Sequence, residues 1–358
     1  MANQYGDCKD KHTLLTSMLQ AVGLRAYPAL MNSSRKIDPD MPSPAQFDHV
    51  ITAIPLGTEM LWADTTAEVA PFQLLSPPLR DKQALLIPNN ASARLETTPA
   101  DPPFLSTEVL EVDGQVNDLG RLSGRSHLTL RGDSEMPFRL MFRRTPRSSW
   151  KELGYYLTMV GGIEGEASEI KPTDPAAFEN PFEVEYAFSN DNFLDWSSKK
   201  LKLKIPLPTL NLAYIRGDSA EITKPIKLGS PIDVSYRLKV TLPTKYQARL
   251  PLPLKVTRDY AEYSSTYKLE GNTLLVERKF RLRQRELPAD RAEDYRAFVA
   301  SARADEAQTL SLETDLAGVP TIPDSVKVEE LIKAAEAAAK SENYPVAEDL
   351  QTCAEKGT

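Results

Sequence analysis

The stretch Gly6-Asp7-Cys8-Lys9-Asp10-Lys11 opens the first segment of this 358-residue chain that has a helical apolar pattern. Leucine, methionine and valine recur three to four residues apart at positions 14, 15, 18, 19 and 22, as on one face of a helix. Gly23 suits the helix end, because glycine adopts the left-handed cap conformation at little cost, and Asp7 is a candidate N-cap. Cys8 is therefore expected in the first helical turn, where unpaired N–H groups, the helix dipole and two lysines favour a thiolate.

Cysteine at a helix start has a simpler interpretation as well. A single cysteine is most often a small buried apolar residue, so its position alone does not make Cys8 a nucleophile. His12 lies one turn further along the same helix, and we expect it on the protein surface.

Two strand-like runs, Phe47–Leu56 and Met60–Thr65, follow a polar, proline-rich loop and are joined near Gly57, which predicts a tight hairpin. In one register His49 lies opposite Asp64, and in the next register the two residues are diagonal neighbours. Both registers place them on one face, where a carboxylate can fix the imidazole tautomer and stabilise the imidazolium. The alternative is a half-buried histidine beside an ordinary strand acid.

Three motifs taken together resemble the core of a transglutaminase-like domain. They are Tyr5–Leu15, Phe47–Ile51 and Trp62–Thr66, and the first contains the Gly-Asp-Cys-Lys-Asp-Lys sequence of a bacterial branch of that superfamily. The resemblance covers roughly the first ninety residues. It implies Cys8 as nucleophile, His49 as general base and Asp64 as the acid that orients the histidine. It also implies a papain-like arrangement in which the cysteine helix packs on an antiparallel sheet.

The chemistry that this resemblance implies is covalent acyl transfer. The Cys8 thiolate attacks a carboxamide or peptide carbonyl of a protein or peptide substrate, and the backbone N–H of Cys8 is a possible oxyanion donor. An amine acceptor gives cross-linking and water gives hydrolysis, and the sequence does not choose between them. Because such domains have helices before the cysteine motif, we expect an N-terminally truncated core. The resemblance also suggests the bacterial cell envelope or periplasm, and the chain shows no signal segment.

The chain as a whole is expected to be α+β, with the transglutaminase-like core in residues 1–90. A proline-rich linker is expected from about Ser76 to Pro103. Alternating apolar and polar residues predict antiparallel strands with one solvated face in two β-rich regions, 104–230 and 231–315. Each region is expected to hold one helix, at 149–160 and 290–307. Residues 325–358 form an expected helical tail that resembles part of a tetratricopeptide repeat and offers a possible protein-binding surface.

The amino-acid composition of the chain argues against several classes of function. A net charge of −7 and a pI near 5.3 argue against nucleic acid as a partner, and the basic stripes at 199–204 and 281–285 are interpreted as solvated strand faces. No run of about 18 apolar residues predicts a membrane span. The two cysteines, Cys8 and Cys353, lie far apart and predict no disulfide, and Cys353 is interpreted as an incidental thiol. No cofactor motif and no metal-ligand cluster is present in the sequence.

Two hypotheses from different classes remain. The first is a cysteine-nucleophile enzyme acting on a protein or peptide. The second is a non-catalytic fragment whose β-rich regions bind a protein or cell-envelope partner. The Arg131-Gly132-Asp133 tripeptide is interpreted as a turn between strands rather than as an adhesion motif.

Overall fold

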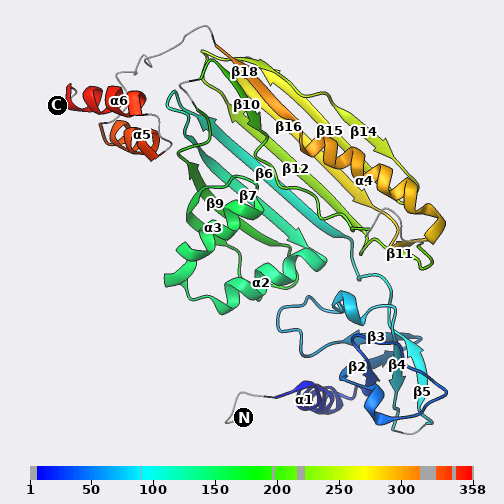
Figure 1. The fold of residues 1–358 in the computed structure, drawn as a ribbon. Helices are drawn as coiled ribbons and strands as arrows, with labels where there is room; N and C mark the ends of the chain where they lie inside the picture. Colours follow the sequence, from blue (N-terminus) through cyan, green and yellow to red (C-terminus); the bar gives the residue numbers. More distant parts are fainter. Residues whose placement is uncertain are drawn as a thin grey trace.

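The computed structural model describes residues 6–89, 91–195, 198–215, 222–314, 328–340 and 344–356. The chain forms an N-terminal unit with a small sheet, a larger unit built on one long sheet, and a C-terminal pair of helices (Figure 1). Helices and antiparallel strands are both abundant, so the fold is α+β, as predicted.

The N-terminal unit consists of one helix and a five-stranded sheet. Helix α1 (Cys8–Ala21) precedes a sheet with the strand order β3-β2-β1-β4-β5. Its strands are β1 (Tyr27–Met31), β2 (His49–Leu56), β3 (Glu59–Ala63), β4 (Gln83–Leu86) and β5 (Arg94–Thr97). Short 3-10 turns lie at Pro44–Gln46 and Pro77–Leu79.

The prediction of a linker from about Ser76 to Pro103 is therefore wrong. Strand β4 pairs with β1, and β5 pairs with β4, so this stretch completes the N-terminal sheet. Ala84 and Leu86 of β4 are fully buried in the small core of this unit. The prolines of the stretch lie between the strands, where they remove no hydrogen-bond donor from the ladder.

The larger unit is organised around an eight-stranded sheet with the order β14-β15-β16-β12-β6-β7-β9-β8. Its strands are β6 (Ser106–Val116), β7 (Leu122–Arg131), β8 (Glu166–Pro172), β9 (Phe182–Asn190), β12 (Ile232–Thr241), β14 (Leu254–Thr257), β15 (Ala261–Glu270) and β16 (Thr273–Leu282). All neighbours are antiparallel except β6 and β12, which run parallel. That pair joins the two β-rich regions expected at 104–230 and 231–315 into one continuous sheet.

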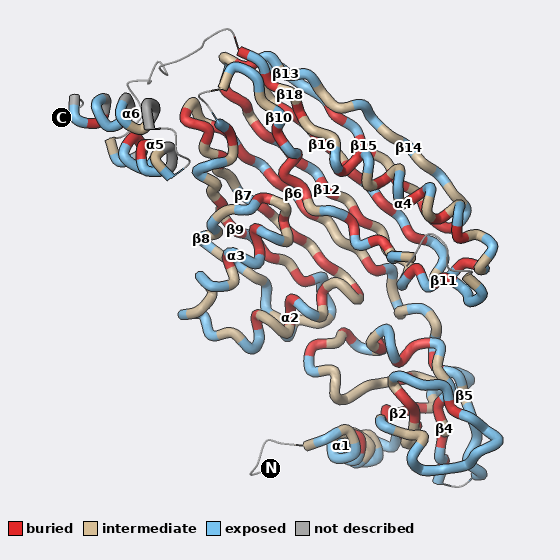
Figure 2. The backbone as a smooth tube through the Cα atoms, in the orientation of Figure 1, coloured by how far each residue is buried: buried red, intermediate tan, exposed pale blue. Residues whose placement is uncertain are grey.

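Helices and a smaller sheet cover one face of the long sheet. Alternate residues of its strands are buried against α2 (Glu135–Arg144), α3 (Trp150–Val160) and α4 (Ala292–Glu306), and the opposite face is exposed (Figure 2). The same core takes in a three-stranded sheet of β10 (Lys200–Lys204), β18 (Thr309–Glu313) and β13 (Gln247–Arg249). Strands β11 (Ile226–Lys227) and β17 (Glu286–Leu287) form a short separate pair. Helices α3 and α4 confirm the two predicted helices, whereas α2 was not predicted.

The C-terminal tail forms two helices, α5 (Val328–Lys340) and α6 (Tyr344–Lys356), in agreement with its predicted helical character. Leu331 and Leu350 are buried together with Leu119, which lies in the turn between β6 and β7. The tail is thus in apolar contact with one end of the long sheet. The side chain of Cys353 lies outside the described part of the chain.

The Arg131-Gly132-Asp133 segment ends β7 and continues into a 3-10 turn, Gly132–Ser134, so the predicted turn is present, but it leads into helix α2 and not into another strand. Gly132 has a φ of +78°, and a Cβ at this position would lie 2.3 Å from the Ser106 hydroxyl, so the turn requires glycine. The Asp133 carboxylate binds the guanidinium of Arg80, which links the turn to the N-terminal unit.

Candidate functional site

Cys8 occupies the first position of α1, as predicted. The Asp7 side chain accepts hydrogen bonds from the backbone N–H groups of Lys9 (2.9 Å) and Asp10 (3.1 Å). The Asp10 carboxylate accepts one in return from the Asp7 N–H at 3.1 Å, which completes a capping box. The cap fixes where the helix begins and places the partly exposed, free thiol of Cys8 in the first turn.

The hairpin of β2 and β3 brings His49 and Asp64 together. Thr52 pairs with Ala63 and Leu56 with Glu59, which is the later of the two possible registers and makes His49 and Asp64 diagonal neighbours. His49 Nε2 lies 3.2 Å from Asp64 Oδ1. Both side chains are largely buried, with 16% and 6% of their surfaces exposed. Gly57 takes a φ of +62° in the connecting turn, as tight hairpins require.

A threonine two residues after Asp64 completes this arrangement. The backbone N–H and the hydroxyl of Thr66 both donate to Asp64 Oδ1, at 2.9 and 2.6 Å. An aspartate that accepts from the residue two positions on forms a common turn motif, so the Asp-Thr-Thr sequence carried a signal for this role. The carboxylate is thereby held in place at the end of β3.

The electrostatics of the pair follow from these contacts. The hydrogen bond that His49 donates to Asp64 raises the pKa of His49, although burial opposes this shift, and the charge of Asp48 contributes a smaller increase. Burial alone would raise the pKa of Asp64, but the hydrogen bonds from His49 and Thr66 outweigh it and lower that pKa. The two groups therefore favour an imidazolium–carboxylate ion pair.

The thiol of Cys8 is not hydrogen-bonded to His49 in the described part of the chain. Because Asp64 binds Nε2, the other ring nitrogen, Nδ1, is the one left to face a nucleophile. Of the three predicted site residues, the structure thus joins His49 and Asp64 by a hydrogen bond, and within the described residues no hydrogen bond joins Cys8 to either of them.

His12 was missed by sequence analysis, and the expectation that it lies on the surface is wrong. Its side chain is buried, and Nδ1 lies 2.8 Å from the hydroxyl of Thr52 on β2. Burial lowers the pKa of His12. The residue therefore acts as a neutral polar anchor between α1, which carries Cys8, and β2, which carries His49.

Among the described residues, the structure contains neither a cluster of metal-ligating side chains nor a helix that could span a membrane. Within them, no group of three or more His, Cys, Asp or Glu side chains could hold a metal ion. No helix in those ranges is long and apolar enough to cross a membrane.

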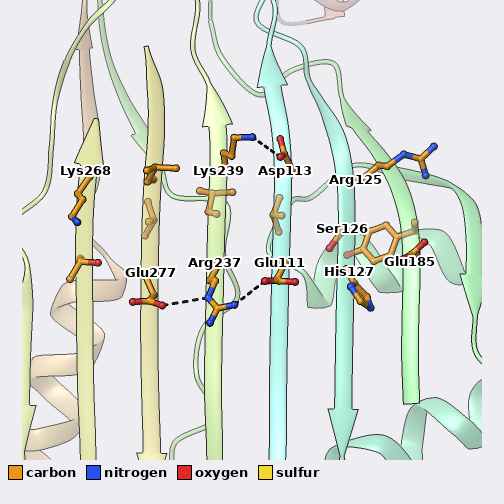
Figure 3. A pocket seen from close by; sticks show the side chains of 16 residues that line it. Glu111, Asp113, Arg125, Ser126, His127, Glu185, Arg237, Lys239, Lys268 and Glu277 are labelled. Carbon is orange, nitrogen blue, oxygen red and sulfur yellow. Dashed lines mark hydrogen bonds and ion pairs between the residues drawn. The ribbon is translucent and has the colours of Figure 1, made fainter. Parts of the chain in front are cut away.

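A broad hollow of about 620 Å³ lies on the exposed face of the long sheet. Figure 3 shows acidic and basic side chains alternating from strand to strand across it. Arg237 on β12 binds Glu111 at 2.9 Å and Glu277 at 3.4 Å, and Lys239 binds Asp113 at 2.9 Å. These charges are exposed and paired, so this surface has the character of a solvated strand face.

The two basic stripes, at residues 199–204 and 281–285, also carry exposed charges that are paired. Lys200, Lys204, Arg281 and Arg283 pair with Glu313, Glu164, Asp233 and Glu262 respectively. These pairs support the interpretation of the stripes as solvated strand faces.

Comparison with known proteins gives two findings. A family model described as "Domain of Unknown Function with solved-structure structure (DUF3858)" matches residues 202–312, and this family is found in transglutaminase-like proteins. A crystal structure described as a "putative protease" from Parabacteroides distasonis is similar over 87% of this chain at 11% identity, with a TM-score of 0.44. The chain spans 45% of that protein's length. No curated protein matches this sequence.

Proposed function

We propose that this chain carries a transglutaminase-like cysteine-nucleophile site in which Cys8 attacks, His49 transfers protons and Asp64 orients His49. The observation that carries the proposal is the hydrogen bond between His49 Nε2 and Asp64 Oδ1. It leaves Nδ1 for a thiol, and α1 packs on the same strand, β2, through His12 and Thr52. The match of residues 202–312 to a family found in transglutaminase-like proteins adds support.

In the proposed reaction, the Cys8 thiolate adds to a carboxamide or peptide carbonyl of a protein or peptide. The imidazolium of His49 gives its proton to the departing amine as the C–N bond breaks, leaving a thioester on Cys8. His49, now neutral, takes a proton from the incoming amine or water as that nucleophile adds to the thioester. The C–S bond then breaks, which restores the Cys8 thiolate and the His49 imidazolium. The carboxylate of Asp64 stabilises the imidazolium in the first step and keeps Nδ1 directed away from itself.

Thiol alkylation tests the proposal. The rate of reaction of Cys8 with iodoacetamide is measured against pH in a Cys353→Ser background, which removes the second thiol. We expect Cys8 to react at neutral pH faster than an unassisted thiol, because an imidazolium stabilises the thiolate. The variant His49→Ala should restore ordinary reactivity, and Asp64→Asn should give an intermediate profile.

A reactivity profile that is ordinary and unaffected by His49→Ala would overturn the enzymatic proposal. The non-catalytic alternative, in which the β-rich part binds a protein or envelope partner, would then be favoured. If the proposal holds, incorporation of a fluorescent primary amine into a glutamine-containing protein distinguishes amine acceptors from water.

A further inference from the structure

A second hollow, with a volume of about 370 Å³, lies on the covered side of the long sheet. It is bounded by β6, β12 and β16 and by the segments 208–213 and 228–230, and Pro77 of the N-terminal unit also lines it. It thus lies where the N-terminal unit meets the end of the long sheet. Junctions between structural units are common places for small-molecule sites.

The two sides of this junction cavity differ in character. On the β6 side it is lined by Ser106 and Glu108, and by Ser134, which hydrogen-bonds Glu108. Two strands away, on the β16 side, it is lined by Phe280, with Tyr295 of α4 and Leu212 among other apolar and aromatic residues. An apolar wall with a few polar groups on one side suits an amphipathic guest.

Glu108 is the distinctive group of the cavity. The Tyr236 hydroxyl donates to its Oε1 at 2.6 Å, and the Ser134 hydroxyl also hydrogen-bonds it. No Lys, Arg or His forms an ion pair with Glu108 in the described ranges. Burial raises the pKa of Glu108, and the two hydroxyl hydrogen bonds offset only part of that shift. Glu108 is half-buried, and a partly desolvated carboxylate without a cation is unfavourable, so a cationic guest would gain from neutralising it.

A guanidinium lies close by but is already bound elsewhere. Arg80 donates to Asp133 at 3.0 Å and to the Ser230 hydroxyl at 3.0 Å, and both of these residues line the cavity. The Arg80 Nε–H donates to the Leu75 carbonyl at 2.7 Å. Arg80 is therefore held by three partners, which leaves Glu108 as the carboxylate that lacks a cation.

We propose that the junction cavity binds a primary ammonium group carried on an apolar chain, with Glu108 as its counter-ion. The alkyl chain lies along the apolar β16 side, and the ammonium donates to the carboxylate. Ligands with this chemistry include free alkylamines and the lysine side chain of a peptide. The site lies apart from Cys8, His49 and Asp64 and does not depend on the proposed reaction.

Calorimetric titration tests the site with three probes at neutral pH: hexylammonium, its neutral counterpart 1-hexanol, and a short peptide with one lysine. We expect hexylammonium to bind more tightly than hexanol. The variant Glu108→Gln, which keeps an acceptor for Tyr236, should weaken hexylammonium binding by about tenfold or more and leave hexanol unchanged. The matched control Glu111→Gln, on the exposed face of the same strand, should leave both affinities unchanged.

Two further measurements identify the source of the ammonium group and test whether its binding depends on the charge of Glu108. Peptide binding that responds to Glu108→Gln indicates a lysine side chain, whereas binding of hexylammonium alone indicates a small amine. Lowering the pH should weaken hexylammonium binding as Glu108 becomes protonated. Equal affinity for hexylammonium and hexanol, no saturable binding of either, or an unchanged affinity in Glu108→Gln would each overturn the proposal.

Discussion

His12 Nδ1 lies 2.8 Å from the hydroxyl of Thr52, and this contact joins α1 to β2. The two side chains are 9% and 0% exposed, and His12 is the buried residue of α1. The helix that carries Cys8 is thus attached to the strand that carries His49 through a polar contact.

The substitution His12→Ala should therefore destabilise the N-terminal unit by about 1–3 kcal/mol, because the Thr52 hydroxyl is left buried without this partner. Urea denaturation measures the effect. Gln20→Ala, at an exposed position of the same helix, is the control and should change stability by less than about 0.5 kcal/mol. If His12→Ala is as mild as the control, the contact does not hold α1 in place.

Acidification should weaken the same contact. Burial lowers the pKa of folded His12 below its unfolded value of about 6.5, so the folded state binds fewer protons than the unfolded state. The stability that this group contributes is fully present above that unfolded value and is lost as the pH falls toward the folded pKa. Urea denaturation from pH 7.5 to pH 5 should show a smaller loss of stability in His12→Ala than in the wild type. Equal losses would contradict this account.

The pKa of His49 is shifted in the opposite direction to that of His12: it is raised. Since the hydrogen bond that His49 donates to Asp64 raises the pKa of His49, Asp64→Asn should lower that pKa, and a histidine NMR titration measures the change directly. Asp48→Asn is the matched control, because Asp48 contributes only a small Coulombic increase and bonds mainly to Ser33. The pair stabilises the folded state below the unfolded His pKa, and this contribution is lost as the pH rises through the folded pKa. A His49 pKa that is unchanged in Asp64→Asn would exclude the orienting role.

The sequence predicted the local elements of the site better than its packing. Spacing and capping residues correctly placed α1, the hairpin, and the approach of His49 to Asp64, because these depend on near neighbours. The apolar pattern of α1 did not predict which face is buried: Leu14, Met18 and Val22 are 39%, 61% and 72% exposed, and His12 is buried instead. That choice depends on Thr52, forty residues away. The parallel pairing of β6 with β12 could not be predicted for the same reason. No local pattern specifies a partner strand more than a hundred residues away.

The ion pair between Arg80 and Asp133 attaches the N-terminal unit to the long sheet, so its loss should weaken that attachment. Arg80 is 4% exposed and binds Asp133 through both terminal nitrogens, whereas Asp133 is about one-fifth exposed. Arg80→Ala should cost roughly 2–3 kcal/mol, since a mostly buried carboxylate loses its partner. We expect faster proteolysis in the segment 98–105, which connects the two units. Arg94→Ala, which removes an exposed pair with Glu96, is the control, and equal cleavage rates in the two variants would contradict the prediction.

The side chain of Asp305 binds α4 to strand β15 of the long sheet. Its buried carboxylate accepts hydrogen bonds from the hydroxyls of Tyr263 (2.6 Å), Ser265 (2.7 Å) and Tyr267 (3.1 Å) on β15, so one side chain of the helix binds three successive inward-facing residues of one strand. Asp305→Ala leaves these hydroxyls buried without their acceptor and should cost about 3–5 kcal/mol. Thermal denaturation measures the loss, and Glu293→Ala, at an exposed position in the first turn of α4, should change stability little. In Tyr267→Phe only the longest of the three bonds is removed, and its hydroxyl goes with it, so the cost should be about 1 kcal/mol. A Tyr267→Phe loss as large as that of Asp305→Ala would show that ring packing, and not the carboxylate, fixes the helix.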